Sequence, residues 1–230
     1  AVAEILAFCG YDFLLIDNEH GPGDPLAVAD QLRAIQVTET VGIVRVPWND
    51  HVTIKKYLDV GVEAVMVPMI QSAEEAKAAV AACKYPPVGI RGIAHTDARA
   101  SNYGLRGLEY LRTANENIFV ILQIESVQGV ENADAIAAVE GVDMILIGPF
   151  DLSASQGHPA EFDRRDHKEA MARVSEAVKR AGKYLGTTPY GGRSLNELYD
   201  QGFDLIIGKP DVSMLRDAAL EQVRMKQMLT

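Results

Sequence analysis

Cysteine is scarce in this sequence, which contains only Cys9 and Cys83 in 230 residues. Both occur on apolar stretches that we predict to be helix faces, where a reduced core thiol is the usual state. Two such thiols argue against a disulfide-stapled secreted scaffold and indicate a reducing, cytoplasmic setting. No apolar run approaches the roughly 18 residues of a membrane span, and no secretory signal is visible, so we expect no membrane partner.

Positive charge is also in deficit, with 22 Lys and Arg against 32 Asp and Glu and a formal net charge of −10. Because a nucleic-acid binder usually needs a basic face, this balance disfavours a polyanionic partner. A small anion can still bind where a few cations or a metal converge. Linkers and low-complexity tracts are missing, and a 48% hydrophobic composition suffices for one core. We therefore predict a single domain over residues 1–230.

Seven short apolar runs rich in Val, Ile and Leu recur along the chain. They are continuously apolar rather than alternating, which is typical of parallel strands covered on both faces. A helical signal follows each run, and most units are about 25–35 residues apart, as in βαβ repeats. The predicted strands are residues 12–17, 41–46, 63–68, 118–124, 143–148, 183–188 and 204–208.

Polar residues before the helical stretches predict where helices begin. Asp24-Pro25 and Asp50 each open a helix, while 72–75 (SAEE) and 194–197 (SLNE) predict capping boxes. A weaker box is predicted at 166–169 (DHKE), and single helices are predicted over 127–139 and 213–223.

The regular order of strand and helix predicts a (β/α)8 TIM barrel. An open doubly wound sheet is the alternative, but the sequence has no GxGxxG glycine motif to favour it. Residues 1–12 predict a helix that precedes the first visible strand, so we infer that the first strand of the barrel is missing from this sequence. One connection, 84–117, is long enough to be a candidate lid or oligomer contact, and whether 153–165 and 187–202 close over a substrate is left open.

Polar residues gather where these strands end, which is where a (β/α) barrel carries its chemistry. Any one of them alone could cap a helix or pair with a surface charge. Their convergence on one rim is what favours catalysis. The residues are Asp17, Glu19, His20, Arg45, Gln123, Glu125, Asp151, Thr188, Lys209 and Asp211.

Glu125 and Asp151 leave neighbouring predicted strands at the same height. Two carboxylates with no nearby Cys or His ligand suit a hard divalent cation that keeps several waters, such as Mg²⁺ or Mn²⁺. Such a site leaves positions open for a bidentate ligand such as a 2-oxo acid. Arg45 could then donate to the keto oxygen, which gains charge on enolisation. His20, oriented by Asp17, is a residue type suited to proton transfer near neutrality.

Seven segments occur in one consistent order from about Ala3 to Leu220: LLIDNEHGP (14–22), IVRVPWND (43–50), LDVGVEAVMVPM (58–69), YPPVGIRG (85–92), ARAS (98–101), QIES (123–126) and IGPFDLSASQG (147–157). Together they resemble the HpcH/HpaI family of class II pyruvate aldolases, which includes 4-hydroxy-2-oxoheptanedioate and 2-dehydro-3-deoxyglucarate aldolases.

The resemblance implies a barrel of the phosphoenolpyruvate/pyruvate-binding type that uses Mg²⁺, Mn²⁺ or Co²⁺. It implies reversible cleavage of a 4-hydroxy-2-oxo acid to pyruvate and an aldehyde. On this basis His20 is the catalytic base with Asp17 as its partner, and Arg45 binds the keto oxygen and stabilises the enolate. Glu125 and Asp151 are the implied metal ligands.

The resemblance also implies how the substrate is bound. Gln123 is a substrate contact, and the backbone at Phe150 and Asp151 holds the pyruvate carboxylate. Asp59 matches an acid that family members bring towards a neighbouring subunit's site, which implies a trimer or hexamer. The sequence departs from the family at Asn18, where many members have Gly, at Phe150, where many have Ala, and over 187–202 and 208–211. The aldehyde is therefore left open.

Three alternatives are left open. Decarboxylation of oxaloacetate, as in macrophomate synthase-like members, would use the same metal and arginine. A Schiff-base aldolase would use Lys209, although a solvated loop amine is the simpler interpretation of that residue. A catalytically silent barrel would be expected to have lost site residues, yet His20, Arg45, Glu125 and Asp151 are all present.

Overall fold

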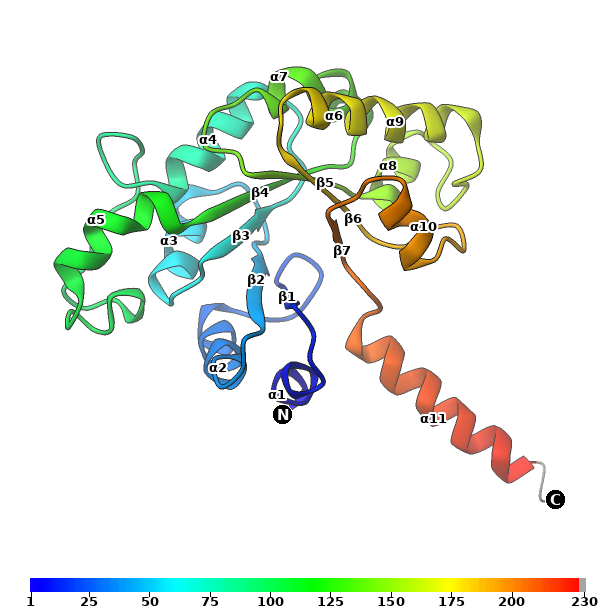
Figure 1. The fold of residues 1–230 in the computed structure, drawn as a ribbon, viewed down its shortest axis with the longest axis horizontal. Coiled ribbons are helices and arrows are strands. Elements are labelled where there is room, and N and C mark those ends of the chain that lie inside the picture. Colours follow the sequence, from blue (N-terminus) through cyan, green and yellow to red (C-terminus); the bar gives the residue numbers. More distant parts are fainter. Residues whose placement is uncertain (228–230) are drawn as a thin grey trace.

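The computed structural model describes residues 1–227 and contains a seven-stranded parallel sheet in the order β1-β2-β3-β4-β5-β6-β7. The sheet curls, with helices packed around its outside (Figure 1). All seven predicted strands are confirmed, with ends that differ by one or two residues. They are β1 (Phe13–Asp17), β2 (Val41–Arg45), β3 (Ala64–Val67), β4 (Phe119–Ile124), β5 (Met144–Ile147), β6 (Tyr184–Thr187) and β7 (Leu205–Ile206).

Helices follow each strand. They are α2 (Pro25–Ile35), α3 (His51–Asp59), α4 (Ala73–Cys83), α5 (Gly107–Asn117), α6 (Val127–Glu131), α7 (Ala133–Ala137), α8 (Pro149–Ser155), α9 (Arg165–Arg180), α10 (Leu195–Asp200) and α11 (Asp211–Gln227), with α1 (Val2–Phe8) before β1 and a short 3₁₀ turn, η1 (Arg99–Ser101).

Three predicted helix starts are confirmed by side-chain caps. The Asp24 carboxylate accepts from the Ala27 N–H at 2.8 Å, and the Asp50 carboxylate accepts from the Thr53 N–H at 2.8 Å. Ser194 forms the predicted capping box at the start of α10. Each of these caps satisfies an N–H group that the first helical turn leaves without a partner.

Two other predicted boxes are corrected by the structure. Ser72 caps α4, but the Glu75 carboxylate accepts from the Gln71 N–H at 2.7 Å instead of returning to the cap residue. The box at 166–169 is wrong, because α9 already begins at Arg165, and its cap residue Arg164 makes no side-chain cap bond. Asp166 is therefore inside the first turn of the helix, where it pairs with Arg164.

Two predicted segments differ in their secondary structure. The single helix predicted over 127–139 is two short helices, α6 and α7, which meet at Asn132. The Asn132 amide donates to the Gln71 carbonyl at 2.7 Å and so ties this break to the loop after β3. The long connection 84–117 is only partly a loop, since η1 and α5 lie within it.

The core has two layers, because successive side chains of each strand point to opposite faces of the sheet. Val44, Val65 and Ile145 pack against the surrounding helices, while Met66 and Ile121 fill the inside of the curl. Each such burial contributes about 1.5–3 kcal/mol. Within residues 1–227 the sheet has seven strands, with β1 and β7 at its edges, so closure by an eighth strand stays a prediction.

The ends of the chain have distinct surroundings. Helix α11 runs away from the body of the fold (Figure 1).

Both cysteines are free, and Cys83 is buried as predicted, with burial raising the pKa of its thiol to about 12. The prediction of a core thiol at Cys9 is wrong, because α1 buries only Ala7 and leaves Cys9 exposed at its end. None of the described helices is both long enough and apolar enough to cross a membrane.

Candidate active site

Asp17 and Arg45 end two neighbouring strands and face each other in register. Arg45 Nε donates to Asp17 Oδ1 at 2.9 Å, and Nη2 donates to Oδ2 at 2.8 Å. Burial alone would raise the pKa of Asp17, but the hydrogen bonds and charge of Arg45, with the N–H groups of Glu19 and His20, lower it. The pair is therefore charged and bidentate, which fixes the plane of the guanidinium.

Glu19 is the second anion on Arg45, with its Oε2 atom 2.9 Å from Nη1. Its side chain is mostly buried, and desolvation raises its pKa against the attraction of Arg45, with Asp17 and Asp151 adding repulsion. The sequence places Glu19 at the strand end but gives it no role. The structure thus adds this residue to the site.

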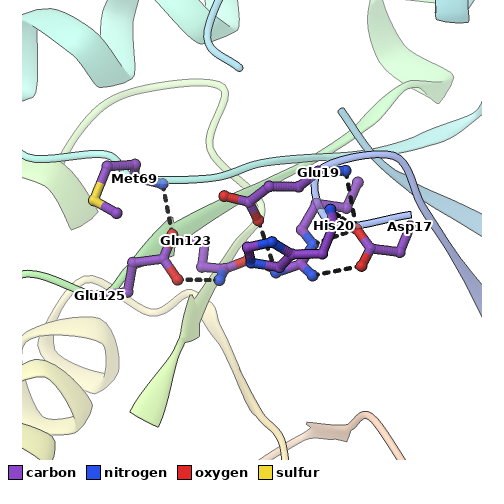
Figure 2. Close-up of polar contacts among 7 residues, drawn as sticks. Asp17, Glu19, His20, Met69, Gln123 and Glu125 are labelled. Carbon is purple, nitrogen blue, oxygen red and sulfur yellow. Dashed lines mark hydrogen bonds and ion pairs between the residues drawn. The ribbon is translucent and has the colours of Figure 1, made fainter. Parts of the chain in front are cut away.

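His20 is exposed beside this group, and its backbone N–H donates to Asp17 Oδ1 at 3.4 Å. The His20 imidazole (Figure 2) is close enough to Glu19 to lower the pKa of that carboxyl by its charge. Asp17 therefore contacts the backbone of His20, while its carboxylate is paired with Arg45. A direct pair between Asp17 and the imidazole stays a prediction.

Glu125 follows β4 and is buried, with 1% of its surface exposed. Its Oε1 atom accepts from the Met69 N–H at 2.8 Å, and its Oε2 atom accepts from the Gln123 amide. The Gln123 Oε1 atom lies 3.5 Å from Arg45 Nη1. Desolvation raises the pKa of Glu125 to about 7, with Glu19 and Asp151 adding repulsion and the two hydrogen bonds opposing it.

Gly148 makes room for this carboxylate. A Cβ atom at that position would lie 2.5 Å from Glu125 Oε2 and 3.0 Å from Gln123 Nε2. Asp151 follows three residues later in the first turn of α8, close enough to raise the pKa of both Glu19 and Glu125. Phe150 is half-exposed, and its ring packs edge-on against Phe162 with centroids 5.0 Å apart.

Other predicted residues lie outside this cluster. Asp59 ends α3, and its carboxylate accepts from the buried Arg91 at 2.8 Å. Lys209 is exposed and pairs with Asp217 of α11. Asp211 begins α11, and the Thr188 hydroxyl donates to the Ile207 carbonyl at 3.1 Å.

The donor set at Glu125 and Asp151 fits a hard cation. A buried carboxylate that two further anions repel is stabilised by a positive ion, and oxygen donors suit Mg²⁺ or Mn²⁺. Within residues 1–227, no group of three or more His, Cys, Asp and Glu side chains is arranged to hold a metal. A two-carboxylate site would complete its coordination with water or substrate.

The fold and the site define the class of protein. The protein has a parallel α/β sheet, and carboxylates, an arginine and a histidine gather at the carboxyl ends of its strands. Enzymes with such folds have their active sites at these strand ends.

The chain belongs to the HpcH/HpaI aldolase/citrate lyase family, whose model matches residues 1–216. It is 42% identical to a hydroxypyruvate/pyruvate aldolase of Delftia acidovorans over 218 residues, which are 95% of this chain and 81% of that protein. It is 44% identical to a 4-hydroxy-2-oxo-heptane-1,7-dioate aldolase of Klebsiella pneumoniae over 184 residues, which are 80% of this chain and 69% of that protein.

Solved structures agree with this assignment. A family member from Burkholderia cenocepacia superposes with a TM-score of 0.93 at 39% identity, covering 98% of this chain and 89% of that one. The family assignment made from the sequence is therefore confirmed. With aldolase-named relatives over most of its length, the chain is a carbon–carbon lyase.

Proposed function

We propose that this protein is a class II aldolase that reversibly cleaves a 4-hydroxy-2-oxo acid to pyruvate and an aldehyde. One observation carries the proposal. A series of hydrogen bonds runs from Asp17 through Arg45 and the neutral amide of Gln123 to Glu125, and so joins a fixed guanidinium to a buried carboxylate. Positive and negative groups held this close suit a reaction in which an oxyanion develops.

Glu125 and Asp151 would hold the divalent cation, Mg²⁺, Mn²⁺ or Co²⁺. When bound there, it would supply Lewis-acid stabilisation of the negative charge that develops on the 2-oxo acid. The Met69 N–H is bound to one Glu125 oxygen and the Gln123 amide to the other. Each oxygen keeps a further lone pair for a ligand.

Arg45 would stabilise the enolate oxygen of pyruvate. Two of its donor groups are bound by Asp17, so the guanidinium is held in one plane before substrate arrives. Its charge persists through the reaction, because its pKa is raised; burial opposes this, but the hydrogen bonds and charges of Asp17, Glu19 and Glu125 outweigh burial.

His20 would act as the base. Its exposed imidazole would accept the proton of the C4 hydroxyl as the C4 oxygen becomes the aldehyde carbonyl. The electrons of the C3–C4 bond then pass into the pyruvate enolate, and a proton delivered to C3 completes pyruvate. In the reverse direction the same imidazole returns the proton to the new hydroxyl.

Gln123 and the backbone at Phe150 and Asp151 would bind the pyruvate half. We infer that Asp59 serves a neighbouring subunit in a homo-oligomer, since its place at the end of α3 lies outside the cluster of its own chain. We also infer a cytoplasmic setting, and a barrel of the (β/α)8 type, which the likeness to the Burkholderia structure supports.

A pyruvate-release assay tests the proposal. The panel contains 4-hydroxy-2-oxo acids that differ in the aldehyde half, each with added Mg²⁺, Mn²⁺ or Co²⁺ and with excess chelator. Release that depends on the metal supports the assignment. Oxaloacetate belongs in the panel, because its decarboxylation would give the same enolate, and preference for it would make decarboxylation the principal activity.

A further inference from the structure

Met69 has a backbone φ of 54°, which lies in the left-handed region. A residue with a side chain rarely adopts this conformation, and such strain persists only where the surroundings fix it, often at functional sites. Three other non-glycine residues of the described chain have positive φ, namely Asn102, Tyr103 and Ala160. Met69 is the one whose N–H contacts a proposed ligand residue.

The conformation has a direct consequence for the N–H groups. Met69 donates to Glu125 Oε1 at 2.8 Å, and the next residue, Ile70, donates to the Gln123 carbonyl at 2.9 Å. In an extended strand, successive N–H groups point to opposite sides. The left-handed residue lets two consecutive N–H groups reach the same neighbour, the end of β4, and Figure 2 shows the Met69 nitrogen directed at Glu125.

The turn is anchored independently of Glu125. The Ile70 side chain is fully buried, and Asn132 of the α6–α7 junction donates to the Gln71 carbonyl at 2.7 Å. Gly129 lies close beneath, since a Cβ atom there would be 2.8 Å from the Ile70 carbonyl oxygen. The chain on the far side of Met69 is thus held in place, which fixes where its N–H points.

We propose that Met69 is a positioning residue for Glu125, and that its left-handed backbone, rather than its side chain, orients the carboxylate for the cation. The Gln123 amide on the other oxygen and the missing Cβ at Gly148 complete the restraint. This inference rests on the proposed function, because it assigns Met69 to the orientation of a proposed metal ligand.

Variants at position 69 show whether the backbone conformation of Met69 or its side chain supports metal binding. Met69→Gly adopts the left-handed conformation readily, Met69→Leu keeps a side chain of similar size, and Met69→Val is β-branched and strongly disfavours positive φ. We expect the Mn²⁺ dissociation constant, measured by electron paramagnetic resonance, to stay within about threefold of wild type for Gly and Leu. We expect it to rise about 10–100-fold for Val, the usual effect of losing an outer-shell contact. Circular dichroism checks that each variant is folded.

Wild-type affinity in folded Met69→Val, or equal losses in Met69→Gly and Met69→Val, would overturn the proposal. If the valine variant does not fold, replacing the Met69 amide by an ester removes the N–H and keeps the side chain. The same loss of Mn²⁺ affinity is expected, and unchanged affinity would count against the proposal.

A metal-free measurement separates this inference from the proposed function. Without metal, the Met69 amide should exchange its hydrogen at least about tenfold faster in Glu125→Ala than in wild type, since the variant lacks the acceptor. Equal rates would overturn the inference. If wild type does not bind Mn²⁺, the proposed metal role of Glu125 falls, and the exchange comparison still decides whether Met69 orients that carboxylate.

Discussion

Arg45 holds Asp17 through two N–H···O bonds of 2.9 and 2.8 Å, from Nε and Nη2, and its remaining nitrogen, Nη1, lies 2.9 Å from Glu19 Oε2. One guanidinium is therefore paired with two carboxylates at the carboxyl ends of β1 and β2. A cation that is fixed in this way cannot turn away when an oxyanion develops nearby. Its value for catalysis is that its orientation is set before the reaction.

We expect Arg45→Ala to lower kcat/KM by about 10²–10³, because one preorganised donor to the developing oxyanion is lost. Mn²⁺ affinity should change little, since Glu125 and Asp151 remain. Arg45→Lys keeps the charge but not the bidentate contact with Asp17, so it should recover little of the activity. Normal turnover by Arg45→Ala would show that another group stabilises the enolate.

Gly148→Ala tests the space around Glu125. The added methyl group would lie 2.5 Å from Oε2, so the carboxylate must move away from its hydrogen bonds. We expect kcat/KM to fall at least about tenfold and Mn²⁺ to bind more weakly, because Glu125 would lose the hydrogen bonds that orient it. Gly208→Ala is the matched control, because no atom lies within 4 Å of a Cβ there. Equal activity of the two variants would contradict this account of Gly148.

His167 should make stability depend on pH. It is 1% exposed, its Nδ1 atom is 2.9 Å from Gln156 Oε1, and its ring packs against Phe162 and Tyr190. Desolvation, with repulsion from Arg193, lowers its pKa below the ordinary value of 6.5. The unfolded chain therefore binds the proton more tightly than the folded protein, so stability is full above about pH 6.5 and falls as the pH drops towards the folded-state pKa.

Urea unfolding between pH 8 and pH 5 measures this effect. The free energy of unfolding of wild type, relative to His167→Gln, should be constant above about pH 6.5 and decrease below it. The glutamine variant is the control because it lacks the titrating group while the other carboxylates titrate alike in both proteins. A difference that does not depend on pH, or that grows in acid, would refute this role of His167.

Lys209→Ala distinguishes the metal mechanism from a Schiff base. Lys209 is exposed and paired with Asp217 of α11, outside the cluster formed by Asp17, Arg45 and Glu125. We expect the variant to retain turnover and borohydride to trap no adduct of wild type with pyruvate. Loss of activity in the variant together with trapping in wild type would favour the lysine mechanism.

The strands and most helix starts could be predicted because their signals are local. Asp24, Asp50 and Ser194 cap helices through bonds to residues three positions away, and seven apolar runs became seven strands. The failures came from tertiary contacts. The Glu75 carboxylate turned to Gln71, and the stretch after Ser126 broke at Asn132, whose amide binds a loop far away in sequence.

The site shows the same division. Residue type and strand ends were enough to select Asp17, Arg45, Gln123 and Glu125, which the structure brings together. Glu19 lay in the same polar run, but its pairing with Arg45 depends on the loop after β1. Met69 gave no signal, because methionine is a poor indicator of a left-handed backbone and its contribution is an N–H that every residue except proline has.

Direct titration with Mn²⁺ alongside pyruvate release tests the central claim, that Glu125 and Asp151 together hold the catalytic ion. Wild type should bind one Mn²⁺ per chain and lose pyruvate release in excess chelator. Glu125→Gln and Asp151→Asn should each weaken Mn²⁺ binding by at least about a hundredfold, beyond the range of outer-shell changes, and lose activity in parallel. Full turnover in chelator, or unchanged Mn²⁺ binding in both variants, would contradict the account.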